Sequence, residues 1–306
     1  MGVEPVRHDP RLTTIVGDRR RLINIAYRLL GSVTEAEDAV QETFTRWCAL
    51  PLEQQESIES PSAWLSTVVS RVCLDQLGSA RAQRERYVGP WLPEPLPDTA
   101  EWSRGQNAAT ADPADRITLD ESIDMAFLIV LDSMTPAERV TFLLHDVFRY
   151  PFAEIAEVVG RTPAACRQLA SSARRRVRAA QPVETSAAQR ADAVRGFRHA
   201  WEAKDVRALV ELLDPQAMAV ADGGGVVLAS LDPIEGREEV AQYFVELAKR
   251  AESLELLERT VNGRPGLVAI HEGAFAAVYS FEIVDYLIRR IWVVRNPDKL
   301  HMWTEL

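Results

Sequence analysis

The sequence predicts a multi-domain fold, in which two all-α modules, the second with a helix-turn-helix, precede a C-terminal α+β domain. Three observations support this fold class. A chain of 306 residues is longer than one ordinary core requires. Apolar residues recur at helical spacing through most of the first 180 residues. Period-two alternation and glycine turns, which indicate strands, appear only after Gln181 and Pro182.

The first module is expected over residues 8–84 and is helical throughout. Leu22 and Leu29 lie two helical turns apart and share the apolar face of one predicted helix. The tetrapeptide TEAE at 34–37 fits a capping box with Thr34 as the N-cap of the next helix. No strand-like alternation interrupts the pattern.

A linker is expected over residues 85–118. Its segment GPWLPEPLPD contains four prolines in ten residues, which prevents a helix and favours extended backbone. Trp91 and Leu92 are apolar, although a solvated spacer has no need of apolar side chains. The sequence therefore leaves two interpretations open, a plain spacer and a segment that docks on another part of the chain.

The second module is expected over residues 119–181. TPAE at 135–138 fits a capping box, and the short helix PFAEIAEVVG ends at Gly160. Thr162 and Pro163 then have the composition of a new helix start. Two helices joined by a tight glycine turn, the first of about eight residues, predict a helix-turn-helix.

The second of these helices is strongly basic. Arg161–Arg178 contains six arginines and no acid, although the chain has a net charge of −10. A local positive face of this kind suits the phosphates of DNA. In a recognition helix the first half meets base edges, and arginine pairs with guanine and glutamine with adenine, so Arg167 and Gln168 are the predicted base readers. A basic face that is merely solvated is the alternative interpretation.

The full set of DNA contacts predicted on this segment includes residues beside the base readers and residues further along that meet phosphate. They are Arg161, Thr162, Arg167, Gln168, Ser171, Ser172, Arg174, Arg175 and Arg178.

The C-terminal domain is expected over residues 186–306, with helices first and an antiparallel sheet after them. AMAVADGGGVVLAS predicts two strands around a glycine turn, and KLHMW predicts a last strand. The titratable residues available for catalysis are Asp222, His271, Tyr279 and Asp285, and none stands in a motif whose spacing demands catalysis. The chain is therefore predicted not to be an enzyme.

Composition excludes several classes of protein. No apolar run approaches the length of about 18 residues that a membrane span needs, and the N-terminal stretch lacks a signal-peptide core, so a cytoplasmic protein is expected. Cys48, Cys73 and Cys166 stand far apart without metal-ligand spacing. No metal and no cofactor are predicted.

Three stretches resemble the bacterial RNA polymerase sigma factors of the extracytoplasmic-function (ECF) group, in the sigma-70 family. AYRLLGSVTEAEDAVQETFTRW is similar to the polymerase-binding helix of sigma domain 2, and SPSAWLSTVVSRVCLDQLGSARAQRE to its promoter-melting helices. LLHDVFRYPFAEIAEVVGRTPAACRQLASSARRRVRA is similar to sigma domain 4, which reads the minus-thirty-five element. The resemblance covers most of residues 11–180.

The resemblance implies two partners, core RNA polymerase through its β and β′ subunits and promoter DNA. It implies that residues 8–84 are sigma domain 2 and residues 119–181 are sigma domain 4. The implied polymerase contacts are Asp38, Gln41 and Glu42, for which a solvated acidic face is the alternative. The implied contacts to the melted minus-ten strand and its phosphates are Trp64, Arg71, Asp75, Gln76, Arg81 and Arg84.

Three further motifs resemble a subgroup whose C-terminal domain is similar to SnoaL-like polyketide cyclases, with a cone-shaped α+β fold. They are WLPEPL at 91–96, DGGG at 222–225 and NPDKL at 296–300. The subgroup usually places a base after DGGG, whereas this chain has Val226. The resemblance implies that the domain regulates the sigma domains in cis, and that a separate anti-sigma factor is not needed.

The residues expected to carry this regulation come from the three motifs. They are Trp91, Leu92, Pro93, Glu94, Pro95, Asp222, Gly223, Gly224, Gly225, Asn296, Pro297, Asp298, Lys299 and Leu300. Two alternatives remain open at this point: a DNA-binding regulator that works without polymerase and senses a ligand, and an enzyme with a vestigial DNA-binding half.

Overall fold

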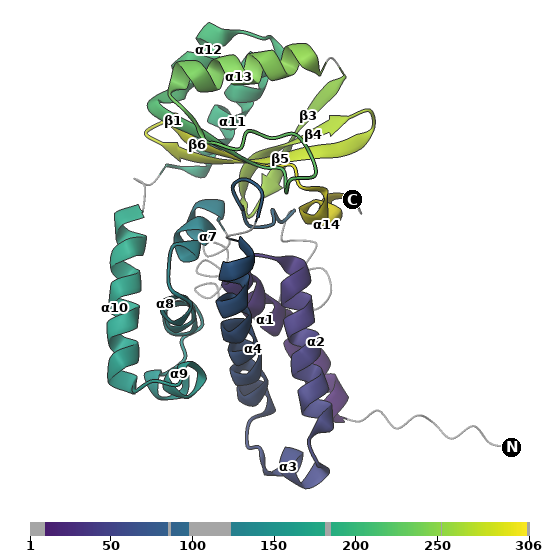
Figure 1. Ribbon diagram of the computed structural model, residues 1–306, viewed down its shortest axis with the longest axis vertical. Helices are drawn as coiled ribbons and strands as arrows, with labels where there is room; N and C mark the ends of the chain where they lie inside the picture. Colours follow the sequence, from purple (N-terminus) through teal and green to yellow (C-terminus); the bar gives the residue numbers. More distant parts are fainter. Residues whose placement is uncertain (1–9, 85–86, 98–123, 181–184, 252, 305–306) are drawn as a thin grey trace, which may run out of the picture. The chain divides into compact units, whose positions relative to one another are not determined.

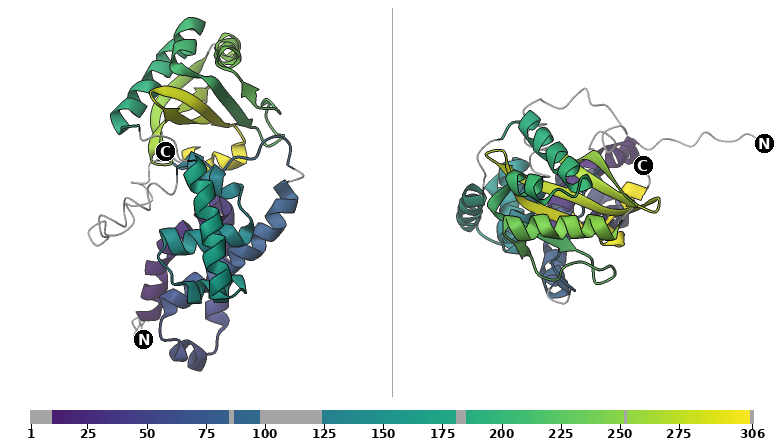
Figure 2. Two further views of the ribbon diagram at one scale, coloured as in Figure 1. Left: turned by 90° about the vertical axis from the view of Figure 1, so that its left-hand side faces the viewer. Right: turned by 90° about the horizontal axis from the view of Figure 1, so that it is seen from above.

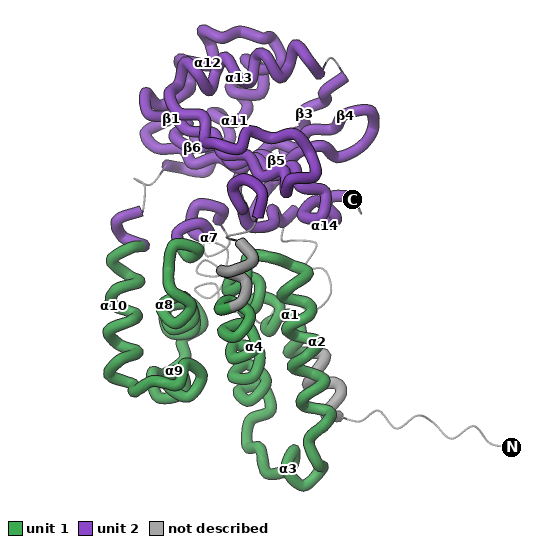
Figure 3. The backbone as a smooth tube through the Cα atoms, in the orientation of Figure 1, with its two compact units in different colours: residues 1–82, 131–176 green, residues 83–130, 177–306 purple. Residues whose placement is uncertain are grey.

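The computed structural model describes residues 10–84, 87–97, 124–180, 185–251 and 253–304. The chain forms two compact units, which are coloured separately in Figure 3. Unit 1 consists of residues 1–82 and 131–176, and unit 2 of residues 83–130 and 177–306.

The first part of unit 1 is a set of helices around a shared apolar core (Figure 1). Leu22, Ile25, Leu29 and Val69 are fully buried in this core. The helices are α1 (Pro10–Leu30), α2 (Val33–Ala49), α3 (Leu52–Ser57) and α4 (Pro61–Arg84).

Helix α2 begins earlier than the sequence predicts. Its N-cap is Ser32, whose hydroxyl accepts a hydrogen bond of 3.2 Å from the Glu35 amide, so the prediction of Thr34 as the cap is wrong. Gly31 ends α1 with a φ of 75°, which lets the chain reverse within two residues and start the next helix at once.

The second helical part follows the linker. Its last two helices form the predicted helix-turn-helix, and a π-helical turn precedes them. The capping box between Thr135 and Glu138 is confirmed, and Gly160 ends the short helix in the left-handed conformation with a φ of 66°. The elements are α7 (Met125–Asp132), α8 (Pro136–Phe142), the π-helical turn η1 (Leu143–Val147), α9 (Phe152–Val159) and α10 (Pro163–Ala180).

Unit 2 is built on a six-stranded sheet in the order β2-β1-β6-β5-β4-β3. The strands are β1 (Leu213–Asp222), β2 (Ile234–Glu235), β3 (Leu254–Val261), β4 (Arg264–His271), β5 (Ala274–Val284) and β6 (Leu287–Val294). The helices are α11 (Ala187–Glu202), α12 (Val206–Leu212), α13 (Arg237–Arg250), the 3-10 turn η2 (Pro297–Lys299) and α14 (His301–Thr304).

The sheet is mixed, because β1 pairs parallel with β6, so the prediction of an antiparallel sheet is wrong at this pair. The two strands are separated in the chain by α13 and by β3 to β5, a crossover long enough to allow the same direction. The predicted α+β class of the C-terminal domain is confirmed.

Two further strand predictions are wrong. Residues 226–230 form no strand, and Leu228 is 92% exposed rather than paired on a sheet. The KLHMW segment is helical instead, because the Asn296 side chain caps η2, and Leu300 and Trp303, three residues apart, are both buried on the same side.

The two faces of the sheet carry separate cores. Helices α11, α12 and α13 cover the inner face, where Phe197, Trp201, Phe244 and Tyr279 pack edge to face or tilted (Figures 1 and 2). The outer face packs against Leu92 of the linker, Met125 of α7, and Leu300 and Trp303 of the C-terminal turns. The linker segment and most of α7, up to Val130, are thus part of the C-terminal unit.

Candidate functional site

The recognition helix α10 has a buried stripe and an exposed face. Cys166, Ala170 and Ala173 are fully buried, and burial raises the pKa of the Cys166 thiol. The exposed face contains most of the predicted DNA contacts, from the turn before the helix to its last turn. These are Arg161, Thr162, Arg167, Gln168, Ser171, Arg175 and Arg178. A row of basic and polar groups on one side of a helix suits a nucleic-acid groove.

Two predicted contacts on α10, Ser172 and Arg174, are half-buried rather than exposed. The Arg174 guanidinium forms a bidentate ion pair with Asp146 of η1, with Nε 2.7 Å from Oδ1 and Nη2 3.2 Å from Oδ2. Ser172 is half-buried and hydrogen-bonds Glu138. Burial raises the pKa of Glu138, but the hydrogen bonds from Ser172 and from Thr135 outweigh it, so the pKa lies below the ordinary value.

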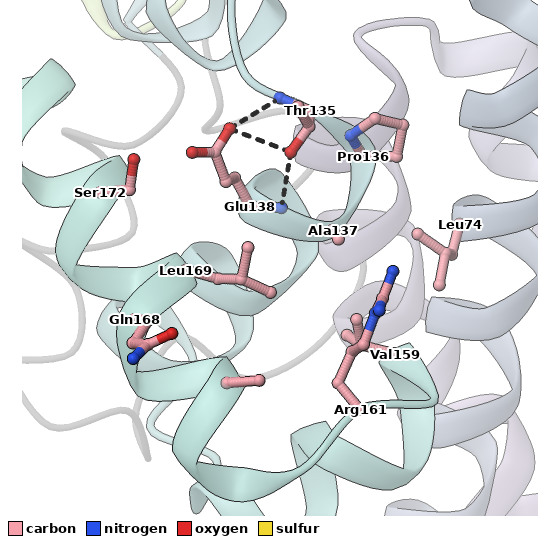
Figure 4. Close-up of a pocket in the computed structure, with 11 residues that line it drawn as sticks. Leu74, Thr135, Pro136, Ala137, Glu138, Val159, Arg161, Gln168, Leu169 and Ser172 are labelled. Atoms are coloured by element: carbon pink, nitrogen blue, oxygen red, sulfur yellow. Dashed lines mark hydrogen bonds between the residues drawn. The ribbon is translucent and has the colours of Figure 1, made fainter.

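A cleft of about 740 Å³ borders the recognition helix within unit 1. It lies between α10 and the start of α8, with Leu74 of α4 at one side (Figure 4). Arg161 and Gln168, two of the predicted DNA contacts, line this cleft. Its lining residues are Leu74, Thr135, Pro136, Ala137, Glu138, Val159, Arg161, Ala165, Gln168, Leu169 and Ser172.

The predicted polymerase contacts share one exposed strip of α2. Asp38, Gln41 and Glu42 are all exposed, at the spacing that places side chains on one helical face. Glu42 accepts a hydrogen bond of 2.8 Å from Arg46, one turn later. The strip is acidic and accessible to a basic partner.

The predicted minus-ten contacts on α4 differ in exposure. Trp64 is half-buried and packs edge to face on Trp47, with ring centroids 5.2 Å apart. Arg71 and Asp75 are exposed, and Arg71 donates a hydrogen bond of 2.9 Å to the Glu157 carbonyl of α9. Gln76 is half-buried.

Two further predicted phosphate contacts, Arg81 and Arg84, belong to the last turns of α4. Their side chains lie outside the described residues.

The three C-terminal motifs meet within unit 2 around one buried ion pair. Lys299 Nζ lies 2.7 Å from Asp222 Oδ2, and the two residues are 7% and 0% exposed. Lys299 also donates a hydrogen bond of 2.6 Å to the Leu92 carbonyl. Asp222 in turn accepts hydrogen bonds from the Leu92 amide at 2.9 Å and from the Tyr87 hydroxyl at 2.6 Å. Both ends of the ion pair therefore hold the linker.

Aromatic rings complete the cage around the Lys299 ammonium. Its Nζ lies 4.2 Å from the ring centroid of Trp91 and 5.1 Å from that of Tyr87. Asn296 donates a hydrogen bond of 2.9 Å to the Tyr87 hydroxyl. Burial, and next the hydrogen bond to Asp222, raise the pKa of Tyr87 above its usual range.

The rest of the WLPEPL segment follows the outer face of the sheet. Residues 92–97 are buried, which includes Pro93, Glu94 and Pro95. The Trp303 indole donates a hydrogen bond of 2.8 Å to the Pro95 carbonyl. Asn262 exchanges two hydrogen bonds with the backbone of Leu96, at 2.9 and 3.0 Å. The linker segment is thus held to the sheet by hydrogen bonds as well as by apolar packing.

The glycines of DGGG allow the close approach. A Cβ on Gly224, whose φ is 64°, would lie 2.5 Å from the Asn296 amide nitrogen, and one on Gly225 would lie 2.9 Å from Val88 Cβ. The Gly223 carbonyl accepts hydrogen bonds from residues 226 and 227. Val226, which replaces the base usual in the subgroup, is 67% exposed.

Comparison with known proteins agrees with this arrangement. Residues 15–83 match Sigma-70 region 2, and residues 125–177 match Sigma-70 region 4. Over 295 residues the chain is 36% identical to the ECF RNA polymerase sigma factor SigJ of Mycobacterium tuberculosis, with 92% of this chain and 90% of SigJ covered. The chain belongs to the ECF RNA polymerase sigma factors.

Other relatives of this ECF sigma factor extend over nearly the whole chain. It is 35% identical over 299 residues to the probable ECF RNA polymerase sigma factor SigI of the same species, with 96% of each chain covered. The crystal structure of M. tuberculosis SigJ superimposes with a TM-score of 0.71 at 32% identity, covering 94% of this chain and 98% of that one. The likeness therefore includes the C-terminal unit.

The boundary of the region 4 match differs from the boundary of the compact units. The region 2 match ends within α4, and the region 4 match begins at Met125, the first residue of α7. Yet Met125 packs against the sheet of the C-terminal unit, and Asp124 pairs with Arg264 of β4 at 2.9 Å. Most of the first region 4 helix thus belongs to the C-terminal unit of the sigma factor, and Met125, Ala126 and Ile129 pack against its sheet.

The residues considered for catalysis in the sigma factor do not share a site. Asp222 is paired with Lys299 on the outer side of the sheet, whereas Tyr279 lies in the inner core, where burial raises the pKa of its hydroxyl. His271 lies within 2.9 Å of the Ser253 hydroxyl, and Asp285 is in the exposed turn between β5 and β6.

The described residues contain neither a cluster of metal ligands nor a helix that could span a membrane. No group of three or more His, Cys, Asp or Glu side chains there could hold a metal ion. No helix in the described part of the chain has the length and apolar character to cross a membrane.

The sequence analysis missed three residues of the linker contact: Tyr87, which belongs to the linker, and Asn262 and Trp303, which bind it. Tyr87 lies just outside the WLPEPL motif, and Asn262 is in a β-turn with a φ of 50°, which is typical of asparagine in turns. The sequence predicts a strand at Trp303, although the spacing of three residues between the apolar Leu300 and Trp303 is typical of a helix.

Proposed function

We propose that this ECF sigma factor brings core RNA polymerase to selected promoters, and that its C-terminal unit controls it in cis by holding the linker. The observation that carries the second part is the buried pair of Asp222 and Lys299, which binds both the amide and the carbonyl of Leu92. A sigma factor works where the polymerase works, which in bacteria is the cytoplasm.

The acidic strip of α2 is the proposed contact with the polymerase. Asp38, Gln41 and Glu42 are exposed together, and acidic side chains favour basic groups of the β′ clamp. The β and β′ subunits of core RNA polymerase are together the proposed partners.

The exposed face of α10 is the proposed contact with the minus-thirty-five element. Arg167 and Gln168 meet base edges, and Arg175 and Arg178 meet phosphates. On α4, the exposed Arg71 and Asp75 are the proposed contacts with the melted minus-ten strand.

The linker contact is strong enough to act as a control. Removing one partner of a buried ion pair costs about 3–5 kcal/mol, because the other charge is left without its partner. Because linker and C-terminal unit are parts of one chain, the contact forms at high effective concentration and needs no separate anti-sigma factor. The C-terminal unit is proposed to be a regulatory module rather than an enzyme.

The polymerase contact is tested by pull-down with core RNA polymerase. The charge reversal Asp38→Arg reduces retention of the full chain at least several-fold, whereas the control Glu53→Arg, at an exposed acid on α3, leaves retention unchanged. Equal retention of the wild type and the Asp38 variant would remove α2 from the interface.

The cis control is tested by transcription from a promoter selected by the wild-type holoenzyme. Lys299→Met keeps the length of the side chain but removes the ammonium, so it releases the linker and raises output. The control Lys249→Met acts on an exposed lysine of α13 in the same unit. Output from a folded Lys299 variant that equals that of the control contradicts cis control by this contact.

A further inference from the structure

We propose that His145, Asp146 and Phe152 are positioning residues, which set the side chains of Arg167 and Arg174 on the recognition helix and so contribute to promoter specificity. The inference rests on the proposed function, in which α10 reads the minus-thirty-five element. None of the three residues belongs to the exposed face of α10, and all lie within unit 1.

Two nitrogens of the Arg174 guanidinium are occupied by contacts within the protein. Its Nε and Nη2 both donate to the Asp146 carboxylate, at 2.7 and 3.2 Å. Nη2 also lies 3.1 Å from His145 Nδ1. A bidentate pair of this kind neutralises the guanidinium and occupies the fork that a phosphate would use. Arg174 therefore orients α10 against η1 instead of adding a phosphate contact.

The π-helical turn η1 presents His145 and Asp146 together. The turn is closed by a hydrogen bond of 3.0 Å from the Phe148 amide to the Leu143 carbonyl, five residues earlier. A π-bulge adds one residue to a helical turn and often marks a functional position. Because an arginine only donates, a hydrogen bond between Arg174 Nη2 and His145 Nδ1 requires that this ring nitrogen accept.

Phe152 links this pair to the predicted base reader. The His145 ring stacks on the Phe152 ring, with centroids 4.0 Å apart and planes inclined by 16°. The Arg167 guanidinium carbon lies 5.6 Å from the centroid of the same Phe152 ring. Arg167 and Arg174 are seven residues apart, which is two helical turns, so they share one side of α10.

The contact between Arg167 and Phe152 bears on which base Arg167 selects. Arginine reads guanine through two parallel hydrogen bonds, which need a fixed direction of the guanidinium. A cation–π contact with Phe152 restricts the rotamers of the exposed Arg167 before DNA arrives, and such preorganisation lowers the entropy lost on binding. Arg175 and Arg178, by contrast, are exposed and suit sequence-independent phosphate contacts.

The experiment uses the full chain with core RNA polymerase. The holoenzyme selects bound duplexes from a promoter-length library randomised at both promoter elements, and bound DNA is sequenced. Phe152→Leu keeps an apolar side chain but removes the ring face. It is expected to lower the preference for guanine at one minus-thirty-five position about two- to five-fold, with other positions unchanged. Phe152→Tyr restores the preference.

The role of Arg174 is tested separately through the salt dependence of binding. Each phosphate contact adds about 0.9 to the slope of log affinity against log salt. The control Arg178→Ala lowers this slope by about that amount and weakens all sequences alike. Arg174→Ala leaves the slope unchanged and broadens base preference. Asp146→Ala also broadens base preference, but it frees the Arg174 guanidinium for phosphate and so raises the slope by up to about 0.9.

The outcomes separate the inference from the proposed function. A wild-type holoenzyme that selects no sequence contradicts the proposed function. A wild type that selects an element while Phe152→Leu keeps the same guanine preference overturns the inference alone. So does an Arg174→Ala variant that loses as much salt slope as Arg178→Ala. If Phe152→Leu fails to fold, as seen by circular dichroism, the Arg174 and Asp146 variants decide the matter.

Discussion

Arg139 offers the sharpest test of how unit 1 is held together. It lies in α8 and is 4% exposed. Its Nε donates to the Leu131 carbonyl at 2.8 Å and its Nη1 to the Leu29 carbonyl at 2.8 Å. Its Nη2 lies 2.7 Å from Asp132 Oδ1. One guanidinium thus joins the end of α1 to the end of α7, two helices from opposite sides of the linker.

Replacing Arg139 with methionine keeps most of the apolar stem but removes every donor. A buried acceptor left without a partner costs about 1–3 kcal/mol. This cost falls mainly on the Leu29 carbonyl, because the Leu131 carbonyl keeps a hydrogen bond of 3.0 Å from the Met134 amide. Asp132 is 31% exposed and regains water, so its share is the smallest. We therefore expect a loss of about 2–3 kcal/mol in the free energy of unfolding. That is a large part of the roughly 5–15 kcal/mol of a typical domain.

The assay is urea unfolding of the full chain, combined with hydrogen exchange at the amides of α1 and α8. Exchange localises the effect, because a chain with two units need not unfold in one step. The matched control is Arg46→Met, whose ion pair with Glu42 is about half exposed and is worth less than about 0.5 kcal/mol. A loss below about 1 kcal/mol for the Arg139 variant, or one equal to the control, refutes the argument.

Two further predictions concern the linker. The pKa of Tyr87 is raised in the folded chain, so its contribution to stability is complete below the unfolded pKa of about 10 and is lost as pH rises above it. Limited proteolysis of the linker should therefore accelerate in alkali, and a Tyr87→Phe variant that accelerates equally would contradict this. Gly225→Ala adds a Cβ 2.9 Å from Val88 Cβ at a φ of 71°, whereas Gly273→Ala meets nothing within 4 Å at a similar φ of 79°. Both variants are strained by about 1–2 kcal/mol because alanine disfavours the left-handed conformation. Only Gly225→Ala should also release the linker, as measured by the same proteolysis. Equal proteolysis of the two variants would show that the close approach to Val88 is unimportant.

Local sequence signals predicted the helical modules well. The capping box of Thr135 and Glu138 and the helix end at Gly160 are confirmed. These features depend on residues within one or two turns, so the sequence alone carries them. The capping-box pattern predicts Thr34 as the cap of α2, but the cap is Ser32, because Gly31 already ends the preceding helix.

Sequence by itself determined that this chain has two helical modules, a basic recognition helix and an α+β domain, since periodicity, caps and charge are properties of neighbouring residues. Only the tertiary structure decided that β1 runs parallel to β6, that Asp222 meets Lys299 across 77 positions, and that Arg174 turns to Asp146. The physical reason is that such contacts depend on which distant groups burial brings together. The spacing of residues along the chain does not predict such contacts.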